Sequence, residues 1–396
     1  MRRPAPRFLV TLASVTLIGP LALHAFLPVM PEVKSEFGIS DALAGLTFSI
    51  SLFIIAFATL VYGSLSDRYG RRPVLLAGLA LFTLGSIVSA LSSSVTGLLV
   101  GRIIQALGAG GSGGLARAIA RDTYGTDVLV KVIAYLTMAY ALGPMIAPVA
   151  AGLLVDSTGW RGAFWFAALA GALIAAAAYV VLYETHAPEH RAQRGSSFLH
   201  DYVRLFSHLR FTAFVLQSGF STGCFFAMAA ANAFLMKDYL GRSATEFSMY
   251  FLAFPAGYFL GNLASSRLSQ RVALENMVLA GTIVNVLAVA SQSLALLAGY
   301  VTPLVLFIPG FLITFGQGLA LPNTQVGAMR VIPSLAGTAS GIGAFCQMFL
   351  GALFVQIYTW LADGTPVPLV ITVASASVLV LAMGVIPVAL KARNVT

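Results

Sequence analysis

The sequence predicts an all-α membrane protein with about twelve transmembrane helices, arranged as two pseudo-symmetric six-helix bundles. Three observations predict it: the composition, a series of long apolar runs, and basic residues confined to alternate connecting segments. Of the 396 residues, 58% are hydrophobic and 9% are charged, whereas a soluble domain carries about 25% charged residues. The mean hydropathy of +0.89 therefore fits a chain whose outer surface faces lipid.

Twelve apolar runs are long enough to cross a bilayer, which takes roughly 20 residues. The first run follows MRRPAPR and continues to about Pro28 without a clear small-residue cleavage site, so we expect a span and not a secretory signal. The divisions inside 74–116 and 277–321 depend on very short turns. The predicted spans are 8–28, 43–63, 74–93, 97–116, 131–154, 161–183, 211–235, 246–266, 277–297, 302–321, 337–360 and 368–390.

The basic residues predict the orientation. With both termini in the cytoplasm, eighteen basic residues lie in cytoplasmic segments and four in external ones, as the positive-inside rule requires. The net charge of +9 then needs no nucleic-acid partner, and we expect a monomer in a bacterial inner membrane. The external residues are Lys34, Arg161, Lys237 and Arg242. The cytoplasmic residues are Arg2, Arg3, Arg7, Arg68, Arg71, Arg72, Arg117, Arg121, Lys131, Arg191, Arg194, Arg204, Arg210, Arg267, Arg271, Arg330, Lys391 and Arg393.

A long polar stretch divides the chain into two halves. We expect an N-terminal bundle at 1–183, a cytoplasmic linker at 184–210 and a C-terminal bundle at 211–396. Within the linker, FLHDYVRLFSHL has apolar residues on one helical face, which is typical of a helix at the membrane surface. A glycine and a basic turn follow span two and recur after span eight, as expected of parallel six-helix repeats.

The first motif is GSLSDRYGRRP, from Gly63 to Pro73. Gly63 is expected to let span two pack closely, and Gly70 to form a tight turn. Asp67 can pair with an arginine or face a helix N-terminus, such as that of span eleven after Pro333. A contact of this kind would act as a gate; the alternative is a simple basic turn. The residues of this gating loop are Gly63, Asp67, Arg68, Gly70, Arg71 and Arg72.

This loop resembles the signature loop of the major facilitator superfamily, in which an acid follows a glycine by four residues and precedes Arg-x-Gly-Arg-Arg or a close variant. The resemblance implies a transporter whose two halves rock about a central cavity. Transport by ATP hydrolysis is not expected, because the sequence has no G-x-x-x-x-G-K-[ST] motif.

The second motif, LLVGRIIQALGAGG, places Arg102 inside span four. A charge at mid-membrane costs about 2.5–3.5 kcal/mol on insertion scales, so it usually has a partner or a task. Gln105 lies one turn away on the same face. The alternative is an arginine that snorkels to the external surface. The motif resembles the superfamily's Arg-x-x-Gln-Gly element, with the glycine displaced to Gly108, and this resemblance implies that Arg102 takes part in proton coupling.

The third motif is a stripe of small residues in span five that includes GPMIAP. Such stripes allow helices to approach closely in lipid, and a similar stripe in span eight predicts a central sliding contact between the two spans. GPMIAP resembles the antiporter motif of the superfamily's exporters, except that Ala151-Gly152 stands where a Gly-Gly pair is common. A proline-bent packing helix is the alternative. The residues concerned are Gly143, Pro144, Pro148, Gly152, Gly257 and Gly261.

HAFLPVMPEV in span one, together with GLALPN and AGTASG, resembles the bicyclomycin- and chloramphenicol-resistance group of drug:proton antiporters. The resemblance implies multidrug efflux, with a proton as the coupling ion and no other cofactor. In that group an acid usually stands where this chain has His24, and here all 14 acids map to loops or span ends. His24 is therefore the predicted proton carrier, and its alternative is a polar residue lining the cavity.

Arg102 is expected at a similar depth to His24, where it would oppose protonation of the imidazole. Asp41 could moderate Arg102, and a cationic substrate could compete with the proton. A cavity with few charges and many aromatic residues suits an amphipathic small molecule. The candidate substrate-binding residues are His24, Gln105, Tyr135, Tyr140, Gln217, Met228, Asn232, Gln317 and Gln347.

Other functions are less well supported by the residues. No nucleophile–base pair or metal-ligand cluster occurs at usable spacing, so neither an enzyme nor a metal site is expected. Cys224 and Cys346 lie in apolar runs and are expected to be buried thiols. Two alternatives to export remain: a metabolite importer or facilitator of the same fold, which the missing membrane acid favours, and a membrane sensor that does not transport.

Overall fold

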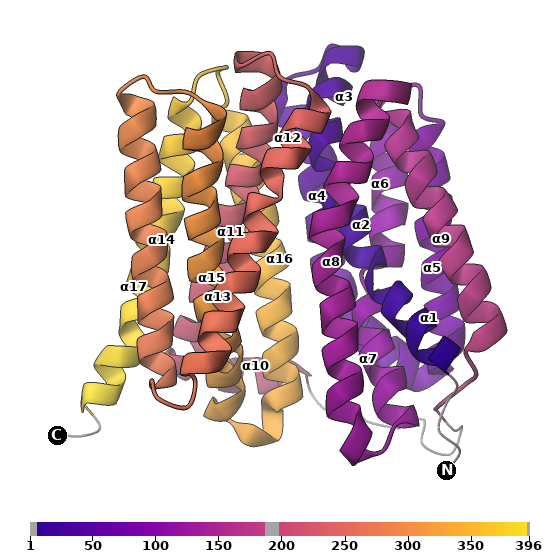
Figure 1. The fold of residues 1–396 in the computed structure, drawn as a ribbon. Helices are drawn as coiled ribbons and strands as arrows, with labels where there is room; N and C mark the ends of the chain where they lie inside the picture. The colour runs from indigo at the N-terminus through magenta and orange to yellow at the C-terminus, as the bar shows by residue number, and fades with distance from the viewer. Residues whose placement is uncertain (1–5, 187–197, 394–396) are drawn as a thin grey trace. The chain divides into compact units, whose positions relative to one another are not determined.

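The computed structural model describes residues 6–186 and 198–393, and the described residues form helices joined by short turns (Figure 1). Arg2, Arg3, Glu189, Arg191 and Arg194 lie outside the described residues. The helices of the first half are α1 (Pro6–Thr16), α2 (Ile18–His24), η1 (Leu27–Val29), α3 (Met30–Phe37), α4 (Asp41–Tyr69), α5 (Arg71–Ala90), α6 (Val95–Ala109), α7 (Ser112–Thr123), α8 (Thr126–Thr158) and α9 (Arg161–Val181).

The helices of the second half are α10 (Phe198–Phe206), α11 (Leu209–Phe234), η3 (Leu235–Tyr239), α12 (Ala244–Phe251), α13 (Ala253–Leu268), α14 (Leu274–Leu297), α15 (Pro303–Val331), η4 (Pro333–Leu335), α16 (Ala336–Leu361) and α17 (Val367–Arg393). In the described ranges, ten helical segments are long and apolar enough to span a membrane. The two other predicted spans are each divided into two shorter helices, so the prediction of about twelve spans is confirmed.

The interruptions in spans one, four and eight have local causes. Proline lacks an N–H and clashes with the carbonyl four residues earlier. In span eight, Pro255 stands four residues after Phe251, where α12 ends. In span one, Pro20 follows the α1–α2 break, and Pro28 lies in the η1 turn. Span four breaks at Gly110–Gly111, and both glycines press against α4, since an added Cβ would overlap Ala58 or the Tyr62 ring.

Two compact units make up the chain. The first contains Met1–Ser40, Leu46–Arg194 and Ser243–Ser248, and the second contains Asp41–Gly45, Gly195–Arg242 and Met249–Thr396. In the first unit, α5 and α6 pack backbone against backbone. An added Cβ at Gly85 would overlap the backbone of Gln105, and one at Gly108 would overlap the backbone of Phe82. Small residues allow this close approach in lipid.

In the second unit, the small residues of α13 face α15. An added Cβ at Gly257 would overlap the carbonyl oxygen of Phe311, and one at Gly261 would overlap that of Phe315. The expectation that these two glycines form a sliding contact with span five stays a prediction. Their sequence spacing correctly marked a close-packed face, but spacing alone does not identify the neighbouring helix.

Two predicted spans ended too early in the sequence. Span two was expected to end at residue 63, but α4 continues to Tyr69, so Gly63 lies inside a helix. An added Cβ at Gly63 would meet no atom of the described residues within 4 Å, and the close packing expected there stays a prediction. Span ten was expected to end at residue 321, but α15 continues through Pro322 to Val331.

The predicted surface helix of the linker is present as α10. Leu205 is buried in a core cluster of the second unit with Phe211 and Phe214. Val203 and Phe206 are exposed instead. The helix therefore anchors one leucine and leaves an apolar face uncovered, as expected of a helix lying at a membrane surface.

Candidate functional site

The guanidinium of Arg102 is buried within the first unit. The side chain is 1% exposed. Its Nε donates to the carbonyl of Thr47 in α4 at 3.1 Å, and its Nη1 donates to the carbonyl of Ala22 in α2 at 2.9 Å. The Phe26 ring lies 4.2 Å from the guanidinium carbon and so contributes a cation–π contact. Arg102 therefore links three helices instead of snorkelling to the surface.

Gln105 completes this arrangement, as its position one turn along α6 predicted. Its Oε1 accepts from Arg102 Nη1 at 2.5 Å, and its Nε2 donates to Ser86 Oγ in α5 at 2.8 Å. These two side chains join four helices through buried hydrogen bonds. Gln105 was expected to contact the substrate. In this structure its side-chain amide is instead hydrogen-bonded to Arg102 and Ser86.

All hydrogen-bond acceptors of Arg102 among the described residues are neutral. They are two carbonyls and an amide, and no carboxylate of the described chain forms an ion pair with it. Asp41, the expected moderator, belongs to the second unit, and its effect on Arg102 stays a prediction. Nη2 has no hydrogen-bond partner in the described chain. A buried cation held by neutral dipoles leaves a net positive charge inside the bundle.

His24 is the last residue of α2 and is 6% exposed. It lies between Ala22, whose carbonyl binds Arg102, and Phe26, whose ring stacks on it. His24 thus lies two residues along span one from each of these two contacts of Arg102. The prediction that the two side chains lie at a similar depth in the membrane stays a prediction.

The gating loop forms a charge cluster at one end of the first unit. Asp67 Oδ1 lies 2.5 Å from Arg71 Nη1, and Arg71 Nε lies 3.2 Å from Asp122 Oδ2. Gly70 has a φ of 102°, a conformation that favours glycine, so the predicted tight turn is present. Arg68 and Arg72 lie over the rings of Tyr69 and Tyr179. The predicted contact of Asp67 with span eleven stays a prediction.

The carboxylate that caps α5 is one that the sequence analysis did not single out. Glu184 accepts the backbone N–H groups of Arg71 at 3.0 Å and Arg72 at 3.2 Å, the first residues of α5. Partial burial is the largest single influence and raises the pKa of Glu184. The backbone N–H groups of His186, Arg71, Arg72 and Thr185 together outweigh it and lower this pKa below its ordinary value. Only the fold brings Glu184 to a helix N-terminus over one hundred residues earlier in sequence.

Several predicted substrate residues hold the second unit together. Gln217 Nε2 donates to Thr282 Oγ1 at 3.1 Å, and Asn232 Nδ2 donates to the carbonyl of Leu306 at 3.0 Å. Gln317 Nε2 donates to Thr222 Oγ1 at 3.1 Å, and Met228 is fully buried. The structure thus gives these amides partners on neighbouring helices. The sequence showed polar residues on span seven but not which of them face inward.

Three other candidates have different environments. Tyr135 is 42% exposed and Tyr140 is 37% exposed, both on α8. Gln347 on α16 is largely buried, and its Nε2 has no hydrogen-bond partner in the described chain. The structure does not bring the nine candidates together at one point of either unit.

The antiporter-like motif lies in α8, which continues through Pro144 and Pro148. An added Cβ at Gly143 would overlap Pro20 of α2, and one at Gly152 would overlap Ser248, which belongs to the same unit. Gly143 therefore presses span five against the half of span one that carries His24.

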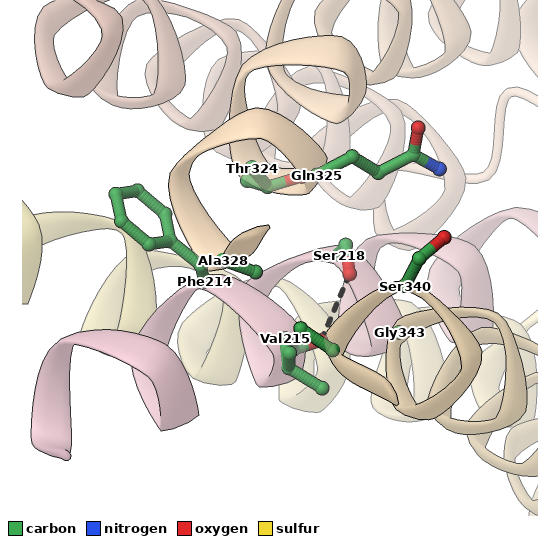
Figure 2. Close-up of a pocket in the computed structure, with 9 residues that line it drawn as sticks. Phe214, Val215, Ser218, Thr324, Gln325, Ala328, Ser340 and Gly343 are labelled. Carbon is green, nitrogen blue, oxygen red and sulfur yellow. Dashed lines mark hydrogen bonds between the residues drawn. The ribbon is translucent and has the colours of Figure 1, made fainter. Parts of the chain in front are cut away.

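A small pocket lies in the second unit between α11, α15 and α16. Figure 2 shows Phe214 and Ser218 from α11 beside Thr324 from α15 and Gly343 from α16. Its volume is about 10 Å³, which is just the size needed for one water molecule. Drug-sized ligands occupy about 300–1,000 Å³, so this pocket does not bind the substrate in this structure.

Broken apolar helices and a buried charge inside the membrane-spanning part are typical of membrane transporters. Residues 12–355 match the sequence model of the Major Facilitator Superfamily. The chain belongs to this family. It is therefore a multi-pass membrane transporter for a small molecule, and it is not an enzyme.

Named relatives and solved structures agree with this family. The chain is 24% identical to the bicyclomycin resistance protein homolog of Haemophilus influenzae, over 94% of both chains. It is 28% identical to multidrug resistance protein D of Escherichia coli, over 84% of both. A POT family transporter solved with 5-aminolevulinic acid is 14% identical, with a TM-score of 0.78 over 98% of this chain and 96% of the other, and it shares the fold.

Proposed function

We propose that the chain exports drug-like amphipathic small molecules from a bacterial cell in exchange for protons. The observation that carries export is similarity along nearly the whole chain to proteins named for drug resistance. The Gly143 motif, pressed against span one, is consistent with it. The proposal includes a bacterial inner membrane, since the named relatives are bacterial, and cytoplasmic termini, as the distribution of basic residues indicates.

Proton coupling is assigned to His24 together with Arg102. An exchanger needs a site that releases its proton readily, and the imidazole can gain and lose a proton near neutral pH. Arg102 lies in the same unit and contacts Ala22 and Phe26, the residues two positions before and after His24. Binding of the substrate at this site would displace the proton from His24. Alternating access would then carry the substrate out of the cell and the proton into it.

A facilitator of the same fold is the second candidate, and one observation favours it. Among the described residues, none of the acids lies in the middle of a predicted membrane span, so the carboxylate that commonly carries a proton is missing from this part of the chain. The two candidates separate in proteoliposomes loaded with unlabelled drug and given labelled drug outside. An antiporter accumulates the label when a pH gradient is imposed, while a facilitator only exchanges it. Accumulation that ignores the pH gradient would contradict the proposed function.

A further inference from the structure

A carboxylate at the end of span five holds the first part of span eight. Asp156 lies near the C-terminal end of α8, and it accepts the backbone N–H of Ala244 at 3.2 Å and that of Thr245 at 2.8 Å. These are the first two residues of α12. The first N–H groups of a helix have no partner inside it, and its N-terminus attracts negative charge. Asp156 therefore caps α12 from another helix.

Close packing accompanies this cap. Gly152 lies one turn before Asp156 on α8, and an added Cβ there would overlap the hydroxyl of Ser248 and the carbonyl oxygen of Ala244. Ser248 is 1% exposed and donates its hydroxyl to the carbonyl of Ala244 at 2.8 Å. Gly152 thus lets α12 lie directly against α8, and Asp156 fixes the end of α12 there.

Span eight is divided between the two units at this place. Ser243–Ser248 belong to the first unit together with α8, whereas Met249 and the rest of the span belong to the second unit. α12 and α13 are separate helices with a break at Leu252. Most of α12 therefore packs as a part of the first unit, although its sequence belongs to the second half of the chain.

The end of span two has the same arrangement of residues. Asp67 and Asp156 each stand two residues before the last residue of their helix. Each is followed, three residues on, by a glycine of positive φ, which is 102° at Gly70 and 82° at Gly159. Spans one to three and four to six of this superfamily are inverted repeats, so span five corresponds to span two with its ends exchanged. Asp156 thus takes the place that Asp67 has in the gating loop.

We propose that Asp156 is a latch, meaning a contact that holds α12 on the first unit while the transporter is closed to the outside. Release of its two hydrogen bonds frees α12 to move with α13. That this end faces the outside rests on the orientation given with the proposed function. Asp156 acts here through its acceptor oxygens, so an asparagine, which caps a helix nearly as well, can replace it.

The test measures how often the contact between α8 and α12 opens, using purified protein in lipid nanodiscs. Ser248→Cys places a thiol of similar size at the buried contact, in a chain that also carries Cys224→Ala and Cys346→Ala. The rate at which this thiol reacts with a water-soluble maleimide reports local opening. Both faces of a nanodisc are in solution, so the result depends neither on the orientation nor on the transported compound.

Asp156→Ala should raise the labelling rate about fivefold, the usual effect of losing a helix cap on a two-state equilibrium. Asp156→Asn, which keeps an acceptor, should raise it less than about twofold. Gly152→Ala wedges the same contact apart without removing the cap, and it should raise the rate as well.

Two controls accompany these variants. Asp363→Ala removes an acid that accepts hydrogen bonds from Thr365 in its own loop, and it should leave the labelling rate unchanged. A second reporter, Ala167→Cys, is buried in α9 of the same unit. Its labelling should not respond to Asp156→Ala, because the latch does not hold α9.

An unchanged rate at Ser248→Cys in both Asp156→Ala and Gly152→Ala would overturn the inference. Equal acceleration at both reporters in both variants would also overturn it, because that result means a loss of the fold and not the opening of a latch. Asp156→Asn acting as strongly as Asp156→Ala would show that the charge, and not the cap, holds α12. None of these results bears on exchange of a drug for protons, which transport assays test separately.

Discussion

At the residue scale, the arrangement around Arg102 is a chain of buried hydrogen bonds in which each side chain orients the next. Ser86 holds Gln105, and Gln105 holds Arg102 against the carbonyls of spans one and two. A hydrogen bond to a charged group is worth more than one between neutral groups. The hydrogen bond that Arg102 donates to Gln105 therefore contributes more to stability than the one that Gln105 donates to Ser86.

Gln105→Leu keeps the side-chain volume but removes the acceptor from Arg102. We expect a loss of about 1.5–3 kcal/mol in the free energy of unfolding, the usual worth of a hydrogen bond to a charge. Ser86→Ala is the matched control, with an expected loss of about 1 kcal/mol, because Gln105 still accepts from Arg102. Unfolding in detergent measures both. A larger loss of unfolding free energy in Ser86→Ala than in Gln105→Leu would contradict this ranking of the two hydrogen bonds.

Glu184 provides a pH-dependent prediction at the same scale. Its pKa in the folded protein lies below the ordinary value, so its contribution to stability is present at neutral pH and is lost as the pH falls through the folded pKa. Glu184→Gln should lower stability at pH 7 by roughly 0.5–1 kcal/mol. This is the low end for a helix cap, because the carboxylate is largely exposed.

The measurement is the melting temperature of Glu184→Gln and wild type in detergent at pH 7 and below pH 4. The gap between them should shrink at the lower pH. A gap that stays constant or grows on acidification would show that the charge of Glu184 does not cap α5.

Some contacts of these buried polar side chains could be predicted from the sequence, and others could not. The spacing of Arg102 and Gln105 predicted their contact, because residues three apart share a helix face. The contacts of Arg102 with Ala22 and Thr47 were not predictable, since they come from backbone carbonyls on other helices. The partners of Gln217 and Asn232 were missed for the same reason. An isolated amide in an apolar run looks alike whether it faces a ligand or a neighbouring helix.

At the element scale, glycines set how closely the helices approach. α5 and α6 pack through Gly85 and Gly108, where no Cβ fits. Packing is a main source of helix association in lipid, so these positions matter more than their small side chains suggest. Apolar run length predicted the helices themselves well. Their breaks and true ends were less predictable, because Pro309 and Pro322 lie inside α15 while Pro255 closely follows a break.

Gly108→Ala tests the close approach of α5 and α6. The new methyl group would overlap the backbone of Phe82, which cannot move as a flexible side chain could, and we expect a loss of about 1–3 kcal/mol from overpacking. Gly113→Ala in α7 is the matched control, since an added Cβ there meets no described atom within 4 Å. It should be neutral or slightly stabilising. Equal melting temperatures of the two variants would contradict the packing account.

At the scale of the whole molecule, the composition and the distribution of basic residues were sufficient to predict a membrane protein with about twelve spans, and the loop at Asp67 was sufficient to indicate the family. These features depend on long stretches of sequence and tolerate local errors. The contact of Asp67 with span eleven stays a prediction, because a sequence pattern does not specify which helices of the two halves meet. The central claim at this scale is exchange of a small molecule for protons through His24.

The measurement that tests this claim most directly uses everted membrane vesicles with an internal pH reporter. The vesicles are energised and then given a panel of amphipathic drugs, with wild type beside His24→Ala and Arg102→Ala. The account predicts that at least one drug releases protons in the wild type and that the release is lost in His24→Ala. Release that survives His24→Ala would place the proton site elsewhere. No pH response to any drug, despite exchange of labelled drug, would contradict antiport and leave a facilitator.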